Sequence, residues 1–213
     1  MKRFFQRDGV AYQASLLGVV ALVASAALAL AAHHTRAPIA AAEARDLEAS
    51  LSQVLPTDFS DNALATDTLL LTDADGAPVK VYRARKGGQV RGVIYQVTGK
   101  GYAGPIAIVM GVDRDGTILG VRVTKHSETP GLGDKVDAAK SDWVLGFSGK
   151  SLAEPQPARW AVKKDGGEFD QFTGATITPR AVVKAVKQGL TFFASHRAEL
   201  VDDGPLTTRS AAR

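Results

Sequence analysis

The residues best placed to do chemistry in this chain lie in the segment Asp170 to Thr176, which reads Asp-Gln-Phe-Thr-Gly-Ala-Thr. A helix is expected directly after it, because Thr178 is a good N-cap and Pro179 suits the first helical position. The first turn of a helix offers unpaired N–H groups and the positive end of the macrodipole, and both stabilise an anion. The segment therefore predicts a site for a phosphate near Thr176, although a plain turn before a helix has the same local pattern.

A second glycine-rich segment, His126 to Gly133, directly follows a predicted strand that ends at Thr124. Thr129-Pro130-Gly131 favours a tight turn, and glycines at 131 and 133 permit positive φ and a close approach of the backbone to a ligand. A purely structural turn would have the same composition, so the spacing alone does not assign a ligand to this loop.

The elements that must position these segments predict an α+β fold class with a mostly antiparallel sheet. Alternating apolar residues between glycine-containing turns indicate strands. These strands are expected at Leu69 to Leu71, Val79 to Arg85, Val90 to Thr98, Ile106 to Val112 and Ile118 to Thr124. Packed helices are expected at Asp134 to Ser141 and from Pro179 to about Glu199, where apolar residues recur at helical spacing.

The N-terminal region predicts a membrane anchor. Val10 to Ala32 is a run of 23 residues without a charge, which is long enough to cross a bilayer as a helix. Lys2, Arg3 and Arg7 precede it, so the excess of positive charge favours a cytoplasmic N-terminus and a soluble domain outside the cytoplasm. A cleaved signal peptide is the alternative, but its apolar region is usually only about 7–15 residues long.

The same reading divides the chain into five parts. A cytoplasmic N-terminus is expected at 1–9, the transmembrane helix at 10–32 and a helical linker at 33–68 that contains a helix from Ala37 to Leu55, ended by Pro56. The soluble domain is expected at 69–200. The polar residues 201–213 are expected to form a flexible tail.

Composition excludes several classes of function. The chain contains no cysteine, which rules out disulfides, cysteine-ligated iron–sulfur clusters and a cysteine nucleophile, so redox work would need an organic cofactor. The 26 Lys and Arg residues against 22 Asp and Glu residues give a net charge of only +4, without a basic stripe. Nucleic acid is therefore not an expected partner.

Several motifs resemble a known family. Asp170 to Thr176 resembles the flavinylation motif of the FMN-binding domain family. His126 to Gly133, Ser141 to Trp143 and Trp160 to Gly167 are similar, in order, to the G subunit of Rnf-type ion-translocating electron transport complexes. The resemblance covers about Val79 to Ala194 together with the N-terminal anchor.

The resemblance implies a membrane-anchored electron carrier in the bacterial inner membrane, with a periplasmic domain and FMN joined covalently through its phosphate to Thr176. Thr173, Gly174 and Ala175 complete the motif, and Glu128, Thr129, Leu132 and Phe172 are the positions expected to lie nearest the flavin. Asp170 would be recognised by a flavin transferase that moves FMN from FAD with the help of a divalent metal. The other expected partners are membrane and iron–sulfur subunits of the complex, and no catalytic side chain or resident metal is expected in the chain itself.

Two alternatives remain open on the sequence. The C subunit of the sodium-translocating NADH:quinone reductase shares the anchor, the domain and the attachment motif. A periplasmic binding or assembly module that carries no flavin would keep the fold without the redox role.

Overall fold

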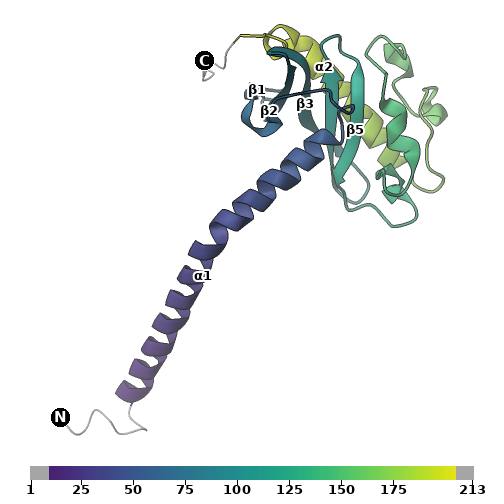
Figure 1. The fold of residues 1–213 in the computed structure, drawn as a ribbon. Coiled ribbons are helices and arrows are strands. Elements are labelled where there is room, and N and C mark those ends of the chain that lie inside the picture. Colours follow the sequence, from purple (N-terminus) through teal and green to yellow (C-terminus); the bar gives the residue numbers. More distant parts are fainter. Residues whose placement is uncertain (1–9, 205–213) are drawn as a thin grey trace. The chain divides into compact units, whose positions relative to one another are not determined.

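The computed structural model describes residues 10–204, and the chain divides into two units, Met1–Asp46 and Leu47–Arg213 (Figure 1). The first unit consists of most of helix α1, which runs from Val10 to Ser52. Its stretch Tyr12–Ala32 has a mean hydropathy of 2.3, and its apolar side chains, among them Leu16, Leu22 and Leu28, are exposed. A helix of this length and composition fits a single-pass membrane anchor.

Helix α1 runs without a break through the stretch predicted as the anchor, 10–32, and through most of the helix predicted from Ala37 to Leu55. The predicted charge asymmetry rests on residues 2–7, which lie outside the described residues. At its C-terminal end α1 stops at Ser52, a few residues before Pro56.

The second unit contains a five-stranded sheet in the order β1-β2-β3-β4-β5, and every neighbouring pair is antiparallel (Figure 1). The strands are β1 Thr68–Thr72, β2 Pro78–Lys86, β3 Gln89–Lys100, β4 Pro105–Asp113 and β5 Ile118–Lys125. Glycines with positive φ occupy three of the connecting turns, at Gly76, Gly88 and Gly116. The predicted strands and the α+β class are confirmed.

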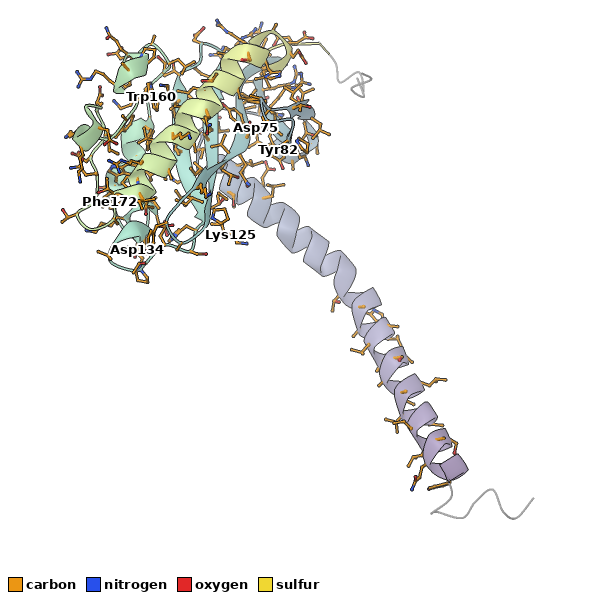
Figure 2. All side chains as sticks on the ribbon, turned by 180° about the vertical axis from the view of Figure 1, so that it is seen from behind. Asp75, Tyr82, Lys125, Asp134, Trp160 and Phe172 are labelled. Carbon is orange, nitrogen blue, oxygen red and sulfur yellow. The ribbon has the colours of Figure 1, made fainter. Side chains whose placement is uncertain are left out.

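Helix α2, Ile177–Leu200, lies across one face of this sheet (Figure 2). Its predicted apolar stripe is buried at Val182, Val183, Val186, Leu190 and Phe193, in one core cluster with Tyr95 and Met110 of the sheet. The hydroxyl of Tyr95 donates a hydrogen bond to the carbonyl of Gly189 at 2.8 Å. Burial raises the pKa of Tyr95 far above its ordinary value, so the phenol stays protonated and keeps donating this bond.

The opposite face of the sheet is covered by the end of α1 and the chain that follows it. Leu51 and Val54 pack with Leu64 against Ile94 and Val109. The next residues along the two strands, Tyr95 and Met110, belong to the core on the α2 side. Successive side chains of a strand point to opposite faces, so β3 and β4 are buried on both faces here.

Glycine is required where the backbone near Val54 crosses the sheet. A β-carbon on Gly120 would lie 2.9 Å from the carbonyl oxygen of Val54 and 3.0 Å from its Cα, which are backbone atoms that cannot swing aside. We expect Gly120→Ala to reduce the free energy of unfolding by about 1–3 kcal/mol, measured by denaturant unfolding. Gly146→Ala is the matched control because nothing lies within 4 Å of the added atom, and equal losses in the two variants would refute this packing.

The predicted helix at Asp134 to Ser141 is wrong. The chain forms short 3₁₀ turns instead, η2 at Gly133–Val136 and η3 at Asp142–Phe147. The Ser141 hydroxyl donates to the carbonyl of Lys135 at 2.7 Å and accepts from the amide of Trp143 at 3.3 Å. These local bonds compete with an α-helix for the same backbone groups.

Further 3₁₀ turns occur at Leu64–Thr66, Pro157–Arg159 and Lys163–Asp165. Aromatic side chains fill the space beneath this irregular part of the domain: the ring centroids of Phe147 and Phe169 are 4.6 Å apart, and those of Trp160 and Phe169 are 5.1 Å apart. This cluster gives the irregular segments their hydrophobic core.

The first residues of the predicted flexible tail are held to the sheet, which corrects that expectation for 201–204. Arg83 donates to the carbonyl of Asp202 at 3.1 Å, and Asp203 forms an ion pair with Arg114 at 3.2 Å. The remainder of the predicted tail, 205–213, lies outside the described residues.

Candidate functional site

The Asp170 to Thr176 segment leads directly into α2, which starts slightly earlier than the sequence indicated. Helix α2 begins at Ile177, and Thr176 is the preceding cap residue, with φ −68° and ψ −25°. The carbonyl of Thr176 accepts a hydrogen bond from the amide of Arg180 at 3.3 Å. The prediction of Thr178 as the N-cap is therefore wrong, because Thr178 lies within the first turn.

The three threonines of this segment differ in their surroundings. Thr178 is fully buried, and its hydroxyl donates to Glu128 Oε2 at 2.5 Å. Thr173 is exposed and Thr176 is partly buried. Within residues 10–204 the structure records no side-chain hydrogen bond for either of them, so these two hydroxyls are available for a ligand.

A turn places Thr176 at the start of the helix. The amide of Ala175 donates to the carbonyl of Phe172 at 3.1 Å, and Gly174 has φ +80°, which strongly favours glycine. Phe172 is only 8% exposed, and its ring lies 5.2 Å from that of Trp143. Phe172 therefore anchors the segment in the core beneath it, close to the end of the domain where α2 begins (Figure 2).

The second predicted segment lies against the first. A β-carbon on Gly174 would be 3.5 Å from a methyl carbon of Leu132, whose side chain is 43% exposed. The amides of Leu132 and Gly133 both donate to the carbonyl of Thr129 at 3.1 Å, which closes the loop into a tight turn. The structure thus brings together the turn at Thr129 to Gly133 and the Asp170 to Thr176 segment, which are about forty positions apart in the chain.

Glu128 lies underneath this junction and is only 5% exposed. Its Oε1 accepts from the amide of Ala103 at 3.0 Å, and its Oε2 accepts from the Thr178 hydroxyl. Both carboxylate oxygens are therefore bonded to the protein. The β3–β4 turn at Gly101 to Gly104 is a part of the site that sequence reasoning missed, and its signal was the pair of glycines between two predicted strands.

Polar contacts hold the chain in place just before and at Asp170. Arg180 of α2 holds Asp165 through two hydrogen bonds of 2.6 and 2.5 Å, and this bonding keeps the pKa of Asp165 below its ordinary value. The carbonyl of Asp170 accepts from Trp143 Nε1 at 2.8 Å, while its carboxylate forms an ion pair with Lys163 at 2.6 Å. The side chain of Asp170 is 68% exposed, so it is accessible to another protein.

The arrangement suits binding of an anion and attachment to an oxygen. The first turn of an α-helix generally offers amides without intrahelical partners, and the macrodipole favours negative charge there. The exposed side chains of Leu132 and Ile177 add apolar surface beside Thr176. No base bonds to the Thr176 hydroxyl in the described part of the chain, and no group of three His, Asp or Glu residues there is arranged to hold a metal ion.

Comparisons with known proteins identify the domain that contains these segments. The FMN-binding domain family matches residues 101–191, a span that begins at the β3–β4 turn and ends within α2. The crystal structure of NqrC from Shewanella oneidensis superposes with a TM-score of 0.57, covering 75% of this chain and 98% of that protein at 21% identity. At that identity the likeness supports the fold alone.

Relatives named as the G subunit of an ion-translocating oxidoreductase complex are much more similar in sequence. The relative from Cereibacter sphaeroides is 55% identical over 195 residues, which covers 92% of this chain and 88% of the relative. The relative from Stutzerimonas stutzeri is 47% identical and covers 88% of this chain and 82% of the relative. This chain therefore belongs to the family formed by the G subunits of ion-translocating oxidoreductase complexes.

Proposed function

We propose that this chain is the flavin-carrying electron-transfer subunit of an ion-translocating oxidoreductase complex, with FMN bound covalently through its phosphate to Thr176. The observation that carries the proposal is the hydroxyl of Thr176 at the start of α2, which has no recorded hydrogen bond within residues 10–204 and lies in the span that matches the FMN-binding domain family. The neighbouring Thr178 is unsuited to the same role because its hydroxyl is buried and bonded to Glu128.

The bound FMN would supply the electron transfer, and the protein residues would hold and orient it. The positive end of the α2 macrodipole would favour the phosphate diester, which keeps a negative charge after attachment. Leu132 and Ile177 lie exposed beside Thr176 and offer apolar contacts to the flavin ring. Thr129 would hold Leu132 in place through the loop turn. Phe172 would support the segment from the core.

Attachment requires a separate transferase, because a threonine hydroxyl without a base is a weak nucleophile. In the proposed reaction, the Thr176 oxygen forms a bond to the FMN phosphorus of FAD, and the bond between the two phosphates breaks. AMP leaves, and the hydroxyl proton passes to the medium. Asp170 is an exposed residue of the motif that the transferase would recognise, and binding of the transferase to its carboxylate would release Lys163 from its ion pair.

The alternative of a flavin-free module is tested on a denaturing gel viewed under ultraviolet light. The full chain made together with a flavin transferase and FAD should give a fluorescent band, because a covalent flavin survives denaturation. The same chain made without the transferase should give none. A dark band in both preparations would refute the carrier proposal.

The partners of the complex are tested by co-purification. An affinity tag on the chain should recover the membrane and iron–sulfur subunits of an Rnf-type complex after mild solubilisation. Recovery of the subunits of a sodium-translocating NADH:quinone reductase instead would favour assignment to that reductase, whose NqrC protein shares the fold.

The proposed location is the bacterial inner membrane, with the N-terminus in the cytoplasm and the domain in the periplasm. This orientation rests on the three basic residues that precede the apolar stretch. External protease should digest the domain in spheroplasts but leave it intact in whole cells with a closed outer membrane. Protection in spheroplasts that becomes digestion only after detergent lysis would reverse the orientation.

A further inference from the structure

We propose that Glu128 is a positioning residue that joins the β3–β4 turn to the first turn of α2 and sets the Thr176 hydroxyl before any flavin is attached. This inference rests on the proposed function of Thr176 and deepens it. It adds a role that Glu128 exerts through the protein to the expectation that this residue lies near the flavin ring.

The contacts of Glu128 connect three segments that are distant in sequence. The residue itself belongs to the loop after β5, its Oε1 accepts from the amide of Ala103 at 3.0 Å, and its Oε2 accepts from the Thr178 hydroxyl at 2.5 Å. Thr178 is two positions after Thr176 on the same helical turn. A change in the Glu128 carboxylate would therefore be transmitted to Thr176 through one short stretch of backbone.

The space around the carboxylate is made by two glycines. A β-carbon on Gly133 would lie 2.8 Å from the Thr178 hydroxyl and 2.9 Å from Glu128 Oε2. A β-carbon on Gly101 would collide with Glu128 Oε1 and would lie 2.8 Å from a methyl carbon of Ile106. The pocket for the carboxylate is thus closely fitted on both sides, which argues for a fixed position.

The electrostatics of the site fit a fixed carboxylate. Glu128 is nine-tenths buried, and the structure records no ion pair for it among the described residues. An amide N–H and a hydroxyl donate to it instead, and it lies at the start of α2, where the helix macrodipole stabilises negative charge. Each carboxylate oxygen is thus held by one donor from a different segment of the chain.

Glu128 can act by positioning Thr176 through its hydrogen bonds or by placing its charge near the flavin, and these two roles predict different results for conservative variants. Glu128→Gln keeps an oxygen that can accept from the Ala103 amide and gains an NH₂ group that can donate to Thr178, whereas Glu128→Ala removes both bonds. Thr178→Ser keeps the hydroxyl, and Thr178→Val removes it with little change in volume. Glu199→Ala is the matched control, because Glu199 is an exposed glutamate near the far end of α2.

The experiment measures the rate of FMN attachment to the full-length apo chain by purified flavin transferase with FAD and Mg²⁺. For a positioning role we expect Glu128→Gln and Thr178→Ser to stay within a few-fold of the parent chain. Glu128→Ala and Thr178→Val should each be slower on the order of ten- to a hundredfold, because a small misplacement of a reacting group has effects of that size. The double variant should be no slower than the slower single variant, since both remove the same contact.

Hydrogen exchange of the Ala103 amide in the apo chain gives a readout that does not depend on flavin. It should become faster in Glu128→Ala and stay protected in Thr178→Val and Glu199→Ala. If the parent chain accepts no FMN at all, the proposed function fails, while this exchange measurement still tests the contact. If Glu128→Ala does not fold, Thr178→Val carries the comparison of attachment rates.

Two results would overturn the inference. Attachment to Glu128→Ala at the rate of the parent chain, with unchanged exchange at Ala103, would show that the contact positions nothing. The second result has two parts: Thr178→Val accepts FMN at the rate of the parent chain, and the flavin attached to Glu128→Gln has a shifted reduction potential. Together they would show that Glu128 acts through its charge on the flavin.

Discussion

A Thr176→Ala chain made together with a flavin transferase should carry no covalent FMN and should give no fluorescent band on a denaturing gel. The loss should be complete because alanine has no oxygen with which to form the phosphoester. Thr173→Ala removes a neighbouring hydroxyl that also has no recorded hydrogen bond among the described residues, and that variant should still be labelled at Thr176. Thr176→Ser keeps a hydroxyl on the same backbone position and should recover part of the labelling.

This loss should not arise from unfolding. Thr176 is partly buried and its side chain makes no recorded hydrogen bond within the described residues, so its replacement by alanine should change the free energy of unfolding by less than about 1 kcal/mol. Circular dichroism and thermal unfolding of the variant check this point. A folded Thr176→Ala chain that still fluoresces would show that FMN is attached elsewhere.

The second large effect is expected at a buried ion-pair network far from the site. Asp67 is 8% exposed and bonds Arg83 at 2.7 Å through one carboxylate oxygen, and Arg85 at 2.5 Å through the other. Arg83 is only 3% exposed; its Nε donates to Asp67, and its buried Nη2 has no hydrogen-bond partner in the described part of the chain. We expect Asp67→Ala to reduce the free energy of unfolding by about 3–5 kcal/mol, because it leaves Arg83 buried without its counter-ion.

An exposed pair provides the control for this prediction. Asp115 pairs with Arg197 at 3.2 Å, but the two side chains are 84% and 53% exposed. Asp115→Ala should therefore cost only about 0–1 kcal/mol in denaturant unfolding. Similar losses in Asp67→Ala and Asp115→Ala would contradict the view that burial makes the Asp67 pair important.

The sheet and α2 could be predicted from sequence because their signals are local. Val121 and Val123 alternate with polar residues along β5, the Asp115-Gly116 turn marks the preceding hairpin, and the apolar stripe of α2 recurs at helical spacing. The expectation that Leu132 lies near the Asp170 to Thr176 segment came from the family resemblance, since nothing local to either segment indicates the other.

The parts that sequence reasoning missed depend on tertiary contacts. Thr178 has the composition of an N-cap, but its hydroxyl is taken by Glu128, a residue fifty positions earlier, and the helix starts before it. The Asp134 to Ser141 segment has helical composition but is held in 3₁₀ turns by the Ser141 hydroxyl. The role of Gly101 depends on a carboxylate that reaches it only after the sheet and loops have folded.

The exposure of Asp170 makes the segment accessible to another protein. Its carbonyl is fixed by Trp143, whereas its carboxylate is paired only with the exposed Lys163. A surface ion pair of this kind is weak and easily exchanged for a contact with another protein. The motif is therefore accessible at Asp170 and Thr173 while its last residue, Thr176, is set by the start of α2.

The most direct test of the account is to locate FMN on the wild-type chain by peptide mass spectrometry. Digestion with trypsin is expected to release residues 165–180, a peptide that contains Thr173, Thr176 and Thr178. After maturation by the transferase, this peptide should be heavier by one FMN less one water, and fragmentation should place the added mass on Thr176. FMN on Thr173 or Thr178, or flavin released entirely on denaturation, would contradict the proposed attachment.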